Sequence, residues 1–430
     1  METKKNYLLP IIMMILLFGM ISFVTNLAAP MGVVLKNQFG VSNAMGMLGN
    51  MANFIGYLVM GIPGGILLQR VGYKKTALIA IGVGILGVFI QFLSGHTSHD
   101  FAFVVYITGA LVAGFSMTLL NTVVNPMLNT LGGGGNKGNQ LIQIGGSFNS
   151  VLATFTPAFV GVLIGEATKA QIKDVFPVMY IAMGVFALVG FVLWAVSIPE
   201  PQAEKASEPI GKLMSGAIKF RHFILGALGI FVYVGVEIGH PATVILWLSD
   251  PDASSVGATI AGSVAGTYWF LMLIGRLLGV TIAEKISSKT MLMFASFVGM
   301  ILVLLAMFSP TSIEVSMPVF QSSDAGAISF GFAKVPINAM FIVIIGLCTS
   351  IMWGAIYNLA VEGLGKYLAV ASGIFMTLVC GGGIIPWIQG LVADAAGYLN
   401  SYWVMFAGLA YLLFYAAIGS KNVNKDIPTT

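Results

Sequence analysis

The chain has 430 residues, of which 57% are hydrophobic and only 8% are charged, whereas about a quarter of the residues in a soluble domain are charged. The mean hydropathy is +0.94, and the net charge is a small +4. This composition excludes a soluble enzyme, a nucleic-acid binder and a disordered chain. Because a membrane-spanning helix needs about 20 apolar residues, the length accommodates about twelve spans.

Apolar runs bounded by charged or turn residues follow one another along the chain. A strand of a membrane barrel would alternate apolar and polar residues over about ten positions, and runs such as 78–92 show no such alternation. Glu314 and Asp324, in the external loop after the ninth run, are expected to be exposed to solvent. The sequence predicts an all-α membrane protein with helices at about 8–35, 43–69, 76–94, 101–129, 139–165, 175–198, 222–249, 256–284, 290–308, 335–361, 367–395 and 400–419.

Basic residues gather on one side of this predicted arrangement. With the N-terminus in the cytoplasm, fifteen Lys and Arg residues fall on the cytoplasmic side and four on the other, which is the bias of the positive-inside rule. Both termini are therefore predicted to be cytoplasmic in a multi-pass protein of a cytoplasmic (inner) membrane. The first run is longer than the apolar core of a signal peptide and has no small-residue cleavage site before Lys36, so it is kept as a helix.

A polar linker divides the helices into two sets of six. The stretch between the sixth and seventh helices concentrates Glu, Lys and Arg side chains and carries two prolines. The predicted organisation is a bundle over 1–198, a cytoplasmic linker over 199–221 and a bundle over 222–430. A faint repeat supports it, because Asn125 and Asn358 each stand seven residues before the glycine of a Leu-Gly pair, and Pro157 and Pro386 each stand four before a glycine. Two repeats around a mid-membrane site are typical of secondary transporters.

The loop after the second helix reads Gly65-Ile-Leu-Leu-Gln69-Arg70-Val-Gly72-Tyr-Lys74-Lys75. It resembles the G-x-x-x-D-R-x-G-R-K signature of the major facilitator superfamily, with glutamine at the acidic position, and a weaker echo begins at Gly275-Arg276. The resemblance implies a gating contact that breaks when the two bundles rock, formed by Gly65, Gln69, Arg70, Gly72 and Arg276. By itself, Arg276 is expected to extend toward the cytoplasmic face or to bind helix ends.

Other segments resemble the fucose/galactose/glucose:cation symporter branch of that superfamily. They are Asn121-Thr-Val-Val-Asn125-Pro126, Ser147-Phe148-Asn149-Ser150, Tyr233-Val-Gly-Val-Glu237, Tyr357-Asn358 and Gly381-Gly382-Gly383-Ile-Ile-Pro386. The resemblance implies a monosaccharide site between the two halves, and alternating access driven by an ion gradient. Members that carry protons have N-L-N-D where this chain has Asn26-Leu27-Ala28-Ala29, and glutamate where it has Asn121. Both usual coupling carboxylates are missing, so coupling has moved, uses another ion, or is absent.

Glu237 lies near the middle of the predicted seventh helix, and His240 follows three positions later on the same helical face. A charge at the bilayer centre costs about 2.5 to 3.5 kcal/mol on insertion scales, so an idle carboxylate there is rare. The two residues are therefore predicted to be the ion-coupling groups. Either they share a proton, or Glu237 supplies an oxygen ligand to sodium; a hydrogen bond between helices is the structural alternative.

Amide and aromatic side chains within the apolar runs are the candidates for sugar binding. Amides both donate and accept hydrogen bonds and are unsatisfied when they face lipid, and aromatic rings offer an apolar face to a sugar. Interhelical hydrogen bonds and ordinary packing are the competing explanations. The predicted substrate-binding residues are Asn26, Asn121, Asn125, Gln143, Asn149, Tyr268, Trp269, Trp353, Asn358 and Trp387.

The predicted function is secondary active transport of a hexose or deoxyhexose, coupled to a proton or a sodium ion. No catalytic residue, metal site or bound cofactor is expected, the partners are a sugar and the lipid bilayer, and the protein is expected to act as a monomer. Two rivals are an uncoupled sugar carrier and a carrier of an amphiphilic lipid or drug, since 24 Met and 29 Phe residues can line an adaptable cavity. A non-transporting membrane sensor or receptor is a further rival, although such a protein would more often carry a sizeable soluble domain. A membrane enzyme ranks last because no catalytic cluster is evident.

Overall fold

The computed structural model describes residues 7–40, 48–164, 171–200, 209–250, 252–254, 256, 258–322, 328–424 and 426–429. Asp324 and the side chains of 27–30 and 157–164 lie outside this description. Among the described residues, eleven helices are long and apolar enough to cross a membrane, and α6, with 30 residues, is a twelfth long helix. The predicted all-α architecture with twelve membrane helices is confirmed.

The chain forms two compact units. Unit 1 comprises Met1–Phe220, Val361–Leu378 and Asn424–Thr430, and unit 2 comprises Arg221–Ala360 and Val379–Val423. Because the units are defined by packing rather than by chain order, the division into two six-helix bundles at the linker remains a prediction from the sequence.

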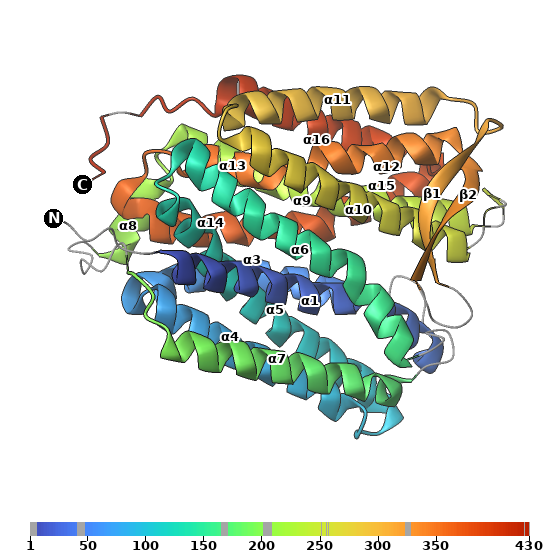
Figure 1. Ribbon diagram of the computed structural model, residues 1–430, viewed down its shortest axis with the longest axis horizontal. Helices are drawn as coiled ribbons and strands as arrows, with labels where there is room; N and C mark the ends of the chain where they lie inside the picture. The colour runs from blue at the N-terminus through green and yellow to red at the C-terminus, as the bar shows by residue number, and fades with distance from the viewer. Residues whose placement is uncertain are drawn as a thin grey trace. The chain divides into compact units, whose positions relative to one another are not determined.

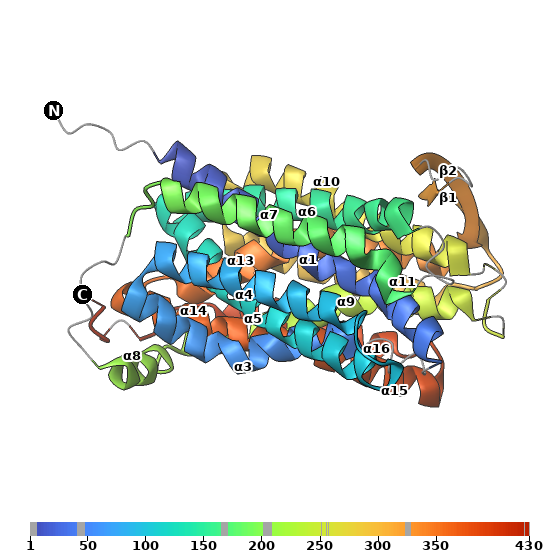
Figure 2. The same ribbon diagram turned by 90° about the horizontal axis from the view of Figure 1, so that it is seen from below.

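Unit 1 consists of helices that run nearly antiparallel to their sequence neighbours. Its elements are α1 (Leu8–Phe39), α3 (Leu48–Val71), α4 (Tyr73–Ser94), α5 (His99–Leu131), α6 (Gly135–Ile164), η1 (Ile172–Val175), α7 (Phe176–Ala195), α8 (Ile210–Ala217), η2 (Gly365–Tyr367) and α14 (Leu368–Thr377). The neighbouring pairs α4 and α5, α3 and α5, and α4 and α7 pack along much of their length (Figures 1 and 2). The linker, predicted as a polar connection, contains the short helix α8 within its described part.

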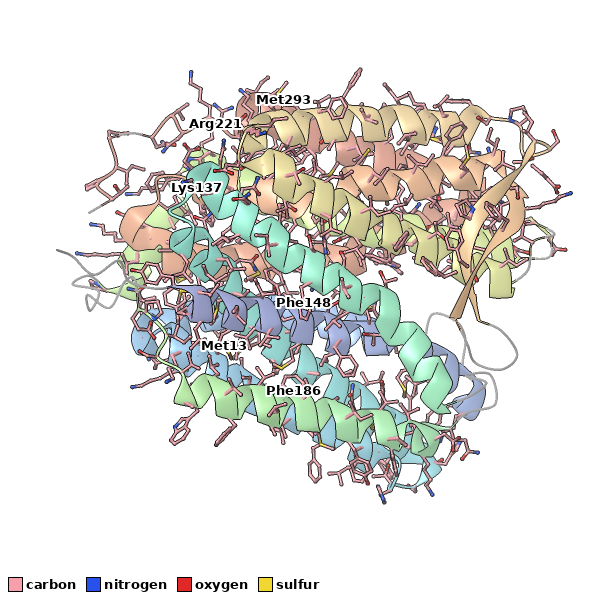
Figure 3. All side chains as sticks on the ribbon, in the orientation of Figure 1. Met13, Lys137, Phe148, Phe186, Arg221 and Met293 are labelled. Atoms are coloured by element: carbon pink, nitrogen blue, oxygen red, sulfur yellow. The ribbon has the colours of Figure 1, made fainter. Side chains whose placement is uncertain are left out.

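Glycines allow these helices to pack closely against one another. A Cβ built on Gly56 of α3 would lie 2.7 Å from the carbonyl carbon of Gly114 of α5, so the two backbones touch there. Phe148 of α6 packs over Gly19 of α1, and Phe186 of α7 packs over Gly84 of α4 (Figure 3). Within a membrane, small residues at helix contacts allow van der Waals packing to replace the hydrophobic effect.

Helix α14 comes from the second half of the sequence but belongs to unit 1. It packs against α3, where a Cβ on Gly65 would lie 2.9 Å from the Cα of Gly373. A Cβ on Gly373 would lie 2.6 Å from the carbonyl oxygen of Gly61. The glycines at 61 and 65 are one helical turn apart, and they give α14 a groove in which backbone meets backbone.

Unit 2 holds the remaining membrane helices and a two-stranded sheet. Its elements are α9 (Arg221–Ser249), α10 (Ala258–Ala283), α11 (Ser288–Phe308), β1 (Glu314–Ser322), β2 (Ile328–Pro336), α12 (Ile337–Thr349), α13 (Met352–Val361), α15 (Gly381–Ala396), α16 (Tyr402–Phe414) and the π-helical turn η4 (Tyr415–Gly419), with η3 (Leu378–Cys380) at its boundary. Helix α9 contacts α10, α12, α15 and α16 and is the central helix of the unit.

Two runs predicted as single helices are interrupted. The run 335–361 is divided into α12 and α13 at Ser350 and Ile351. Near this break, the hydroxyl of Thr349 donates to the carbonyl of Ile345 and that of Ser350 donates to the carbonyl of Leu347. Such side-chain bonds to the preceding turn compete with the helical ladder and bend helices. The run 367–395 is likewise divided, into α14, η3 and α15.

The segment after α11, predicted as an exposed loop, contains an antiparallel hairpin instead. Strand β1 pairs with β2 from Glu314 opposite Pro336 to Ser322 opposite Ile328. The hairpin contacts α10 and α12, and Glu314 at its start is exposed as predicted. Alternation of buried and exposed residues along 330–335 is the period-two pattern of a strand with one packed face.

Candidate functional site

Glu237 and Arg276 form a buried ion pair inside unit 2. The Nη2 of Arg276 lies 3.2 Å from the Oε1 of Glu237, and each residue is only 8% exposed. The Nε of Arg276 donates to the carbonyl of Ser350 at 3.2 Å, at the break between α12 and α13. Three helices, α9, α10 and α12, therefore meet at one guanidinium.

A glycine next to the arginine makes this meeting possible. A Cβ on Gly275 would collide with the Oγ of Ser350, so only glycine lets α10 approach the helix break so closely. Of the two expectations for Arg276, the structure shows the binding of a helix end, because its Nε donates to the carbonyl of Ser350 at the C-terminal end of α12. Its guanidinium stays inside the unit, where a carboxylate and a carbonyl compensate the cost of removing it from water. Neither Ser350 nor the pairing was apparent from the sequence, although the Gly275-Arg276 dipeptide was.

Aromatic side chains enclose the ion pair. Tyr233 lies one helical turn before Glu237 and is fully buried, with its ring 6.2 Å from that of Trp353. Tyr268 is also fully buried, and its hydroxyl is 2.9 Å from that of Thr349. Trp269 packs edge-on against Tyr268 at 5.4 Å. Tyr268, Trp269 and Trp353, three of the predicted sugar-stacking residues, thus lie in the same unit as the ion pair, although Tyr268 offers no accessible face in this conformation.

His240 does not pair with Glu237. Its Nδ1 lies 2.6 Å from the carbonyl oxygen of Val236, so this nitrogen carries the proton. Its ring is stacked at 6.4 Å from that of Tyr268 and tilted at 5.6 Å from that of Tyr402. The alternative in which glutamate and histidine share a proton is therefore not what the structure shows, because the glutamate has an arginine as its partner.

The predicted amides of unit 1 form hydrogen-bonded clusters. The Nδ2 of Asn121 donates to the hydroxyl of Tyr57 at 2.7 Å, which joins α5 to α3. One turn further on, the Nδ2 of Asn125 donates to the carbonyl of Asn121 at 2.9 Å. All three residues are buried. Tyr57 was not singled out by sequence reasoning, although it is a polar aromatic side chain in an apolar run.

A second cluster joins α1 to α6. The hydroxyl of Ser22 donates to the carbonyl of Asn149 at 2.6 Å, and the Nδ2 of Asn149 donates to the carbonyl of Phe18 at 3.1 Å. Asn26 donates to the carbonyl of Ser22 at 2.8 Å. Gln143 is buried six residues before Asn149 and lies 3.5 Å from the Oδ1 of Asn139.

The remaining two candidates, Asn358 and Trp387, lie in unit 2. Asn358 of α13 is buried and donates to the hydroxyl of Ser288 at the start of α11, at 2.9 Å. Trp387 of α15 is 62% exposed. Asn358 thus joins two helices, and Trp387 lies on the surface of the unit.

Glu200, which is far along the chain, binds the signature loop after α3. Gly72 has φ +82°, and immediately after it the carboxylate of Glu200 accepts hydrogen bonds from the backbone N–H groups of Tyr73 and Lys74, at 2.7 and 3.0 Å. The Nζ of Lys74 in turn donates to the carbonyl of Val196 at 2.7 Å, near the end of α7. The carboxylate caps the start of α4 and the ammonium caps the end of α7, each at the pole it favours.

The sequence profile of the Major Facilitator Superfamily matches residues 11–387 of this chain. The chain belongs to the major facilitator superfamily. Its sequence is 29% identical over 426 residues to a glucose/galactose transporter of Brucella abortus, covering 98% of this chain and 96% of that protein. It is 21% identical over 418 residues to the L-fucose-proton symporter of Escherichia coli strain K12, covering 92% and 89%.

Solved structures agree with this assignment at the level of the fold. The crystal structure of the fucose:proton symporter of E. coli superposes with a TM-score of 0.79 at 18% identity, covering 97% of this chain and all of that one. A proton:xylose symporter of the same superfamily superposes with a TM-score of 0.69 at 14% identity, covering 96% of both chains.

Proposed function

We propose that this protein is a monosaccharide:cation symporter that works by alternating access in the cytoplasmic (inner) membrane, with both termini in the cytoplasm. The named activities of its relatives support a hexose or deoxyhexose as the cargo. The observation that carries the coupling is the ion pair between Glu237 and Arg276, buried in helices that are long and apolar enough to cross a membrane.

Glu237 is the proposed coupling group, and the proton is the proposed ion. With Arg276 at 3.2 Å, the carboxylate has a counter-charge, and the guanidinium repels a metal cation from the same oxygen. A proton is different, because it neutralises the carboxylate and thereby releases the arginine. The pair can then exist in two states, closed when Glu237 is charged and open when it is protonated. His240 supports this element by packing rather than by accepting the proton.

The amide clusters of unit 1 are the proposed sugar-binding groups. Asn121 and Asn125 with Tyr57, and Asn149 with Asn26, present hydrogen-bond donors and acceptors within apolar helices. In the absence of sugar, these hydrogen bonds satisfy the donors and acceptors of the amides, since a buried amide without a hydrogen-bond partner is energetically costly. Sugar hydroxyls replace part of this network when the cargo binds.

The contact between α3 and α14 is the proposed gate. Gly65 and Gly373 bring the two backbones together, and such a contact opens without breaking strong polar bonds. The signature residues Gln69, Arg70 and Gly72 follow directly at the end of α3 and after it. Arg276, grouped with them by sequence, belongs instead to the coupling pair.

Uptake by purified protein in proteoliposomes tests this function. A panel of labelled hexoses and deoxyhexoses would be offered with a proton gradient and, separately, a sodium gradient. We expect accumulation only with the proton gradient. Accumulation with sodium alone would contradict the proposed ion, and equilibration without accumulation under either gradient would identify an uncoupled carrier.

Substitutions at the ion pair test the coupling group. Glu237→Gln, with Arg276→Gln in the same chain to keep the charges balanced, is expected to abolish accumulation while exchange of sugar across the membrane persists. Glu314→Gln, at an exposed carboxylate of β1, is the matched control and is expected to accumulate sugar normally. Gradient-driven accumulation by the double variant would overturn the role of Glu237.

A further inference from the structure

The hairpin of β1 and β2 has two unlike faces. Along β2, Ala333 and Val335 are buried, whereas Phe330 and Phe332, on the other face, are 61% and 67% exposed. Phe320 of β1 stands directly opposite Phe330, with ring centroids 5.6 Å apart. The hairpin therefore packs an aliphatic face on unit 2 and presents an aromatic face outward, which we call the aromatic face (Phe320, Phe330 and Phe332).

The aromatic face is continuous with one side of α10. The ring of Phe320 meets that of Phe270 edge-on at 4.8 Å, and the hydroxyl of Thr267 donates to the carbonyl of Pro318 at 3.2 Å. From Phe270, a stripe at helical spacing continues along α10 through the exposed Leu277 and Leu278. On a helix that crosses a membrane, an exposed apolar stripe faces hydrocarbon. The three phenylalanines thus extend a lipid-facing surface.

The hairpin also begins at the level where the hydrocarbon ends. Helix α11 has 21 residues, a length of about 31 Å that matches the thickness of a hydrocarbon core. Phe308 at its last position packs edge-on against Trp403, near the start of α16, with centroids 6.2 Å apart. Tryptophan is enriched at the membrane interface, which places Trp403 and the neighbouring Phe308 at this boundary, and β1 starts shortly after it, at Glu314.

We propose that the aromatic face is an interfacial anchor that binds phospholipid at the boundary between headgroups and acyl chains. Lys334 lies on the same face of β2 as Phe330 and Phe332 and is exposed, so its ammonium can meet a lipid phosphate while the rings enter the acyl region. The occupant is lipid rather than a second copy of the chain because the face adjoins the hydrocarbon-facing stripe of α10. This anchor is independent of the cargo; its assignment to the outer leaflet rests on the proposed orientation.

Spin labels test the anchor. Cys348 and Cys380 are buried and free; with both replaced by alanine, one label is placed through Phe332→Cys and a control label through Glu314→Cys. In vesicles of phosphatidylcholine and phosphatidylglycerol, collisions with oxygen and with a water-soluble nickel chelate are compared. We expect the ratio of oxygen collisions to chelate collisions to be at least several-fold higher for the label at 332 than for the label at 314.

Two results would overturn the proposal. A label at 332 with the same collision ratio as the label at 314 would place the face in water, and low collision with both reagents would show that protein covers it. Phe332→Trp gives a second measurement that keeps an aromatic ring: vesicles of brominated lipid are expected to quench its added fluorescence, and iodide in the water is expected not to. Quenching by iodide alone would equally reject the anchor.

Discussion

The interiors of the two units are polar in different ways. Unit 1 holds neutral groups, with Tyr57, Asn121 and Asn125 linked by hydrogen bonds between α3 and α5. Unit 2 holds two opposite charges, Glu237 and Arg276, at 3.2 Å. Removing the hydrogen-bond partner of a buried neutral amide lowers the stability by the free energy of desolvating one dipole. Removing the partner of a buried charge leaves that charge uncompensated, which lowers the stability by more. The two units are therefore expected to respond very differently to the same kind of substitution.

This difference suggests a division of labour. A neutral hydrogen-bonding network can exchange partners with a polar, uncharged ligand at nearly constant energy, which suits the recognition of sugar hydroxyls. A charge pair changes its state when a proton arrives, which suits coupling to a gradient.

Arg276→Gln is expected to have the largest effect on stability. Removing one member of a buried pair typically costs about 3 to 5 kcal/mol, because Glu237 is left without its counter-charge. Thermal unfolding in detergent measures the loss. The double variant with Glu237→Gln is the control and is expected to recover most of it; equal stability of the single and double variants would show that the pair is not energetically coupled.

Gly373→Val tests whether the close contact of α14 with α3 depends on glycine. The added side chain meets the backbone at Gly61 and Gly65, and overpacking of this kind costs about 1 to 3 kcal/mol. The control is Gly184→Ala in α7, where nothing lies within 4 Å of an added Cβ and no loss is expected. If both variants unfold at the same temperature, the helices are further apart than the structure shows.

Tyr57→Phe and Asn121→Leu test the neutral network. Since both groups are uncharged, each single variant and their coupling in a double-mutant cycle are expected to lie near 1 kcal/mol. The cycle is measured by unfolding the wild-type protein, the two single variants and the double variant in detergent. Sugar affinity is expected to fall with Asn121→Leu. A coupling as large as that of the ion pair would remove the distinction between the units.

Glu200→Gln is expected to have the smallest effect. Glu200 is the acid of unit 1 that caps the start of α4, but it is partly exposed, so water and salt screen it. A charge at a helix N-terminus contributes about 0.3 to 1 kcal/mol, and the loss is expected to shrink in high salt. Unfolding temperatures at low and high ionic strength measure it, and an unscreened loss of several kcal/mol would contradict this role.

The membrane class and the helices followed from composition and run length. An apolar run of about 20 residues has few alternatives to a membrane helix, so most helix positions agree to within a few residues. The breaks at Ser350 and at Leu378 were missed, because a bend depends on side-chain bonds and neighbouring helices rather than on hydropathy. The hairpin was missed because an external segment was assumed to lack structure and because residues 330–335, Phe-Gly-Phe-Ala-Lys-Val, do not alternate between apolar and polar types.

The candidate residues were found by type, but their partners were not. A carboxylate in an apolar run can be recognised as a functional candidate from the sequence, since the membrane makes such a residue costly. Its partner cannot be recognised in this way, because Arg276 is 39 positions away. A basic residue near the middle of a helix is equally consistent with a side chain that extends to the interface. Glu200, 127 positions from Tyr73, shows the same limit for the signature loop.

Composition, hydropathy and short motifs along the chain were enough to predict a membrane protein of twelve helices, its superfamily, and which polar residues lie within apolar segments. These are properties of single residues and their near neighbours, read from hydropathy and short motifs. The folded structure was needed to show that Glu237 pairs with an arginine instead of a histidine, that Asn121 donates to Tyr57, and that Asn125 donates to Asn121. Hydrogen bonds and ion pairs join atoms in space, and the spacing of residues along the chain does not specify which helices will meet.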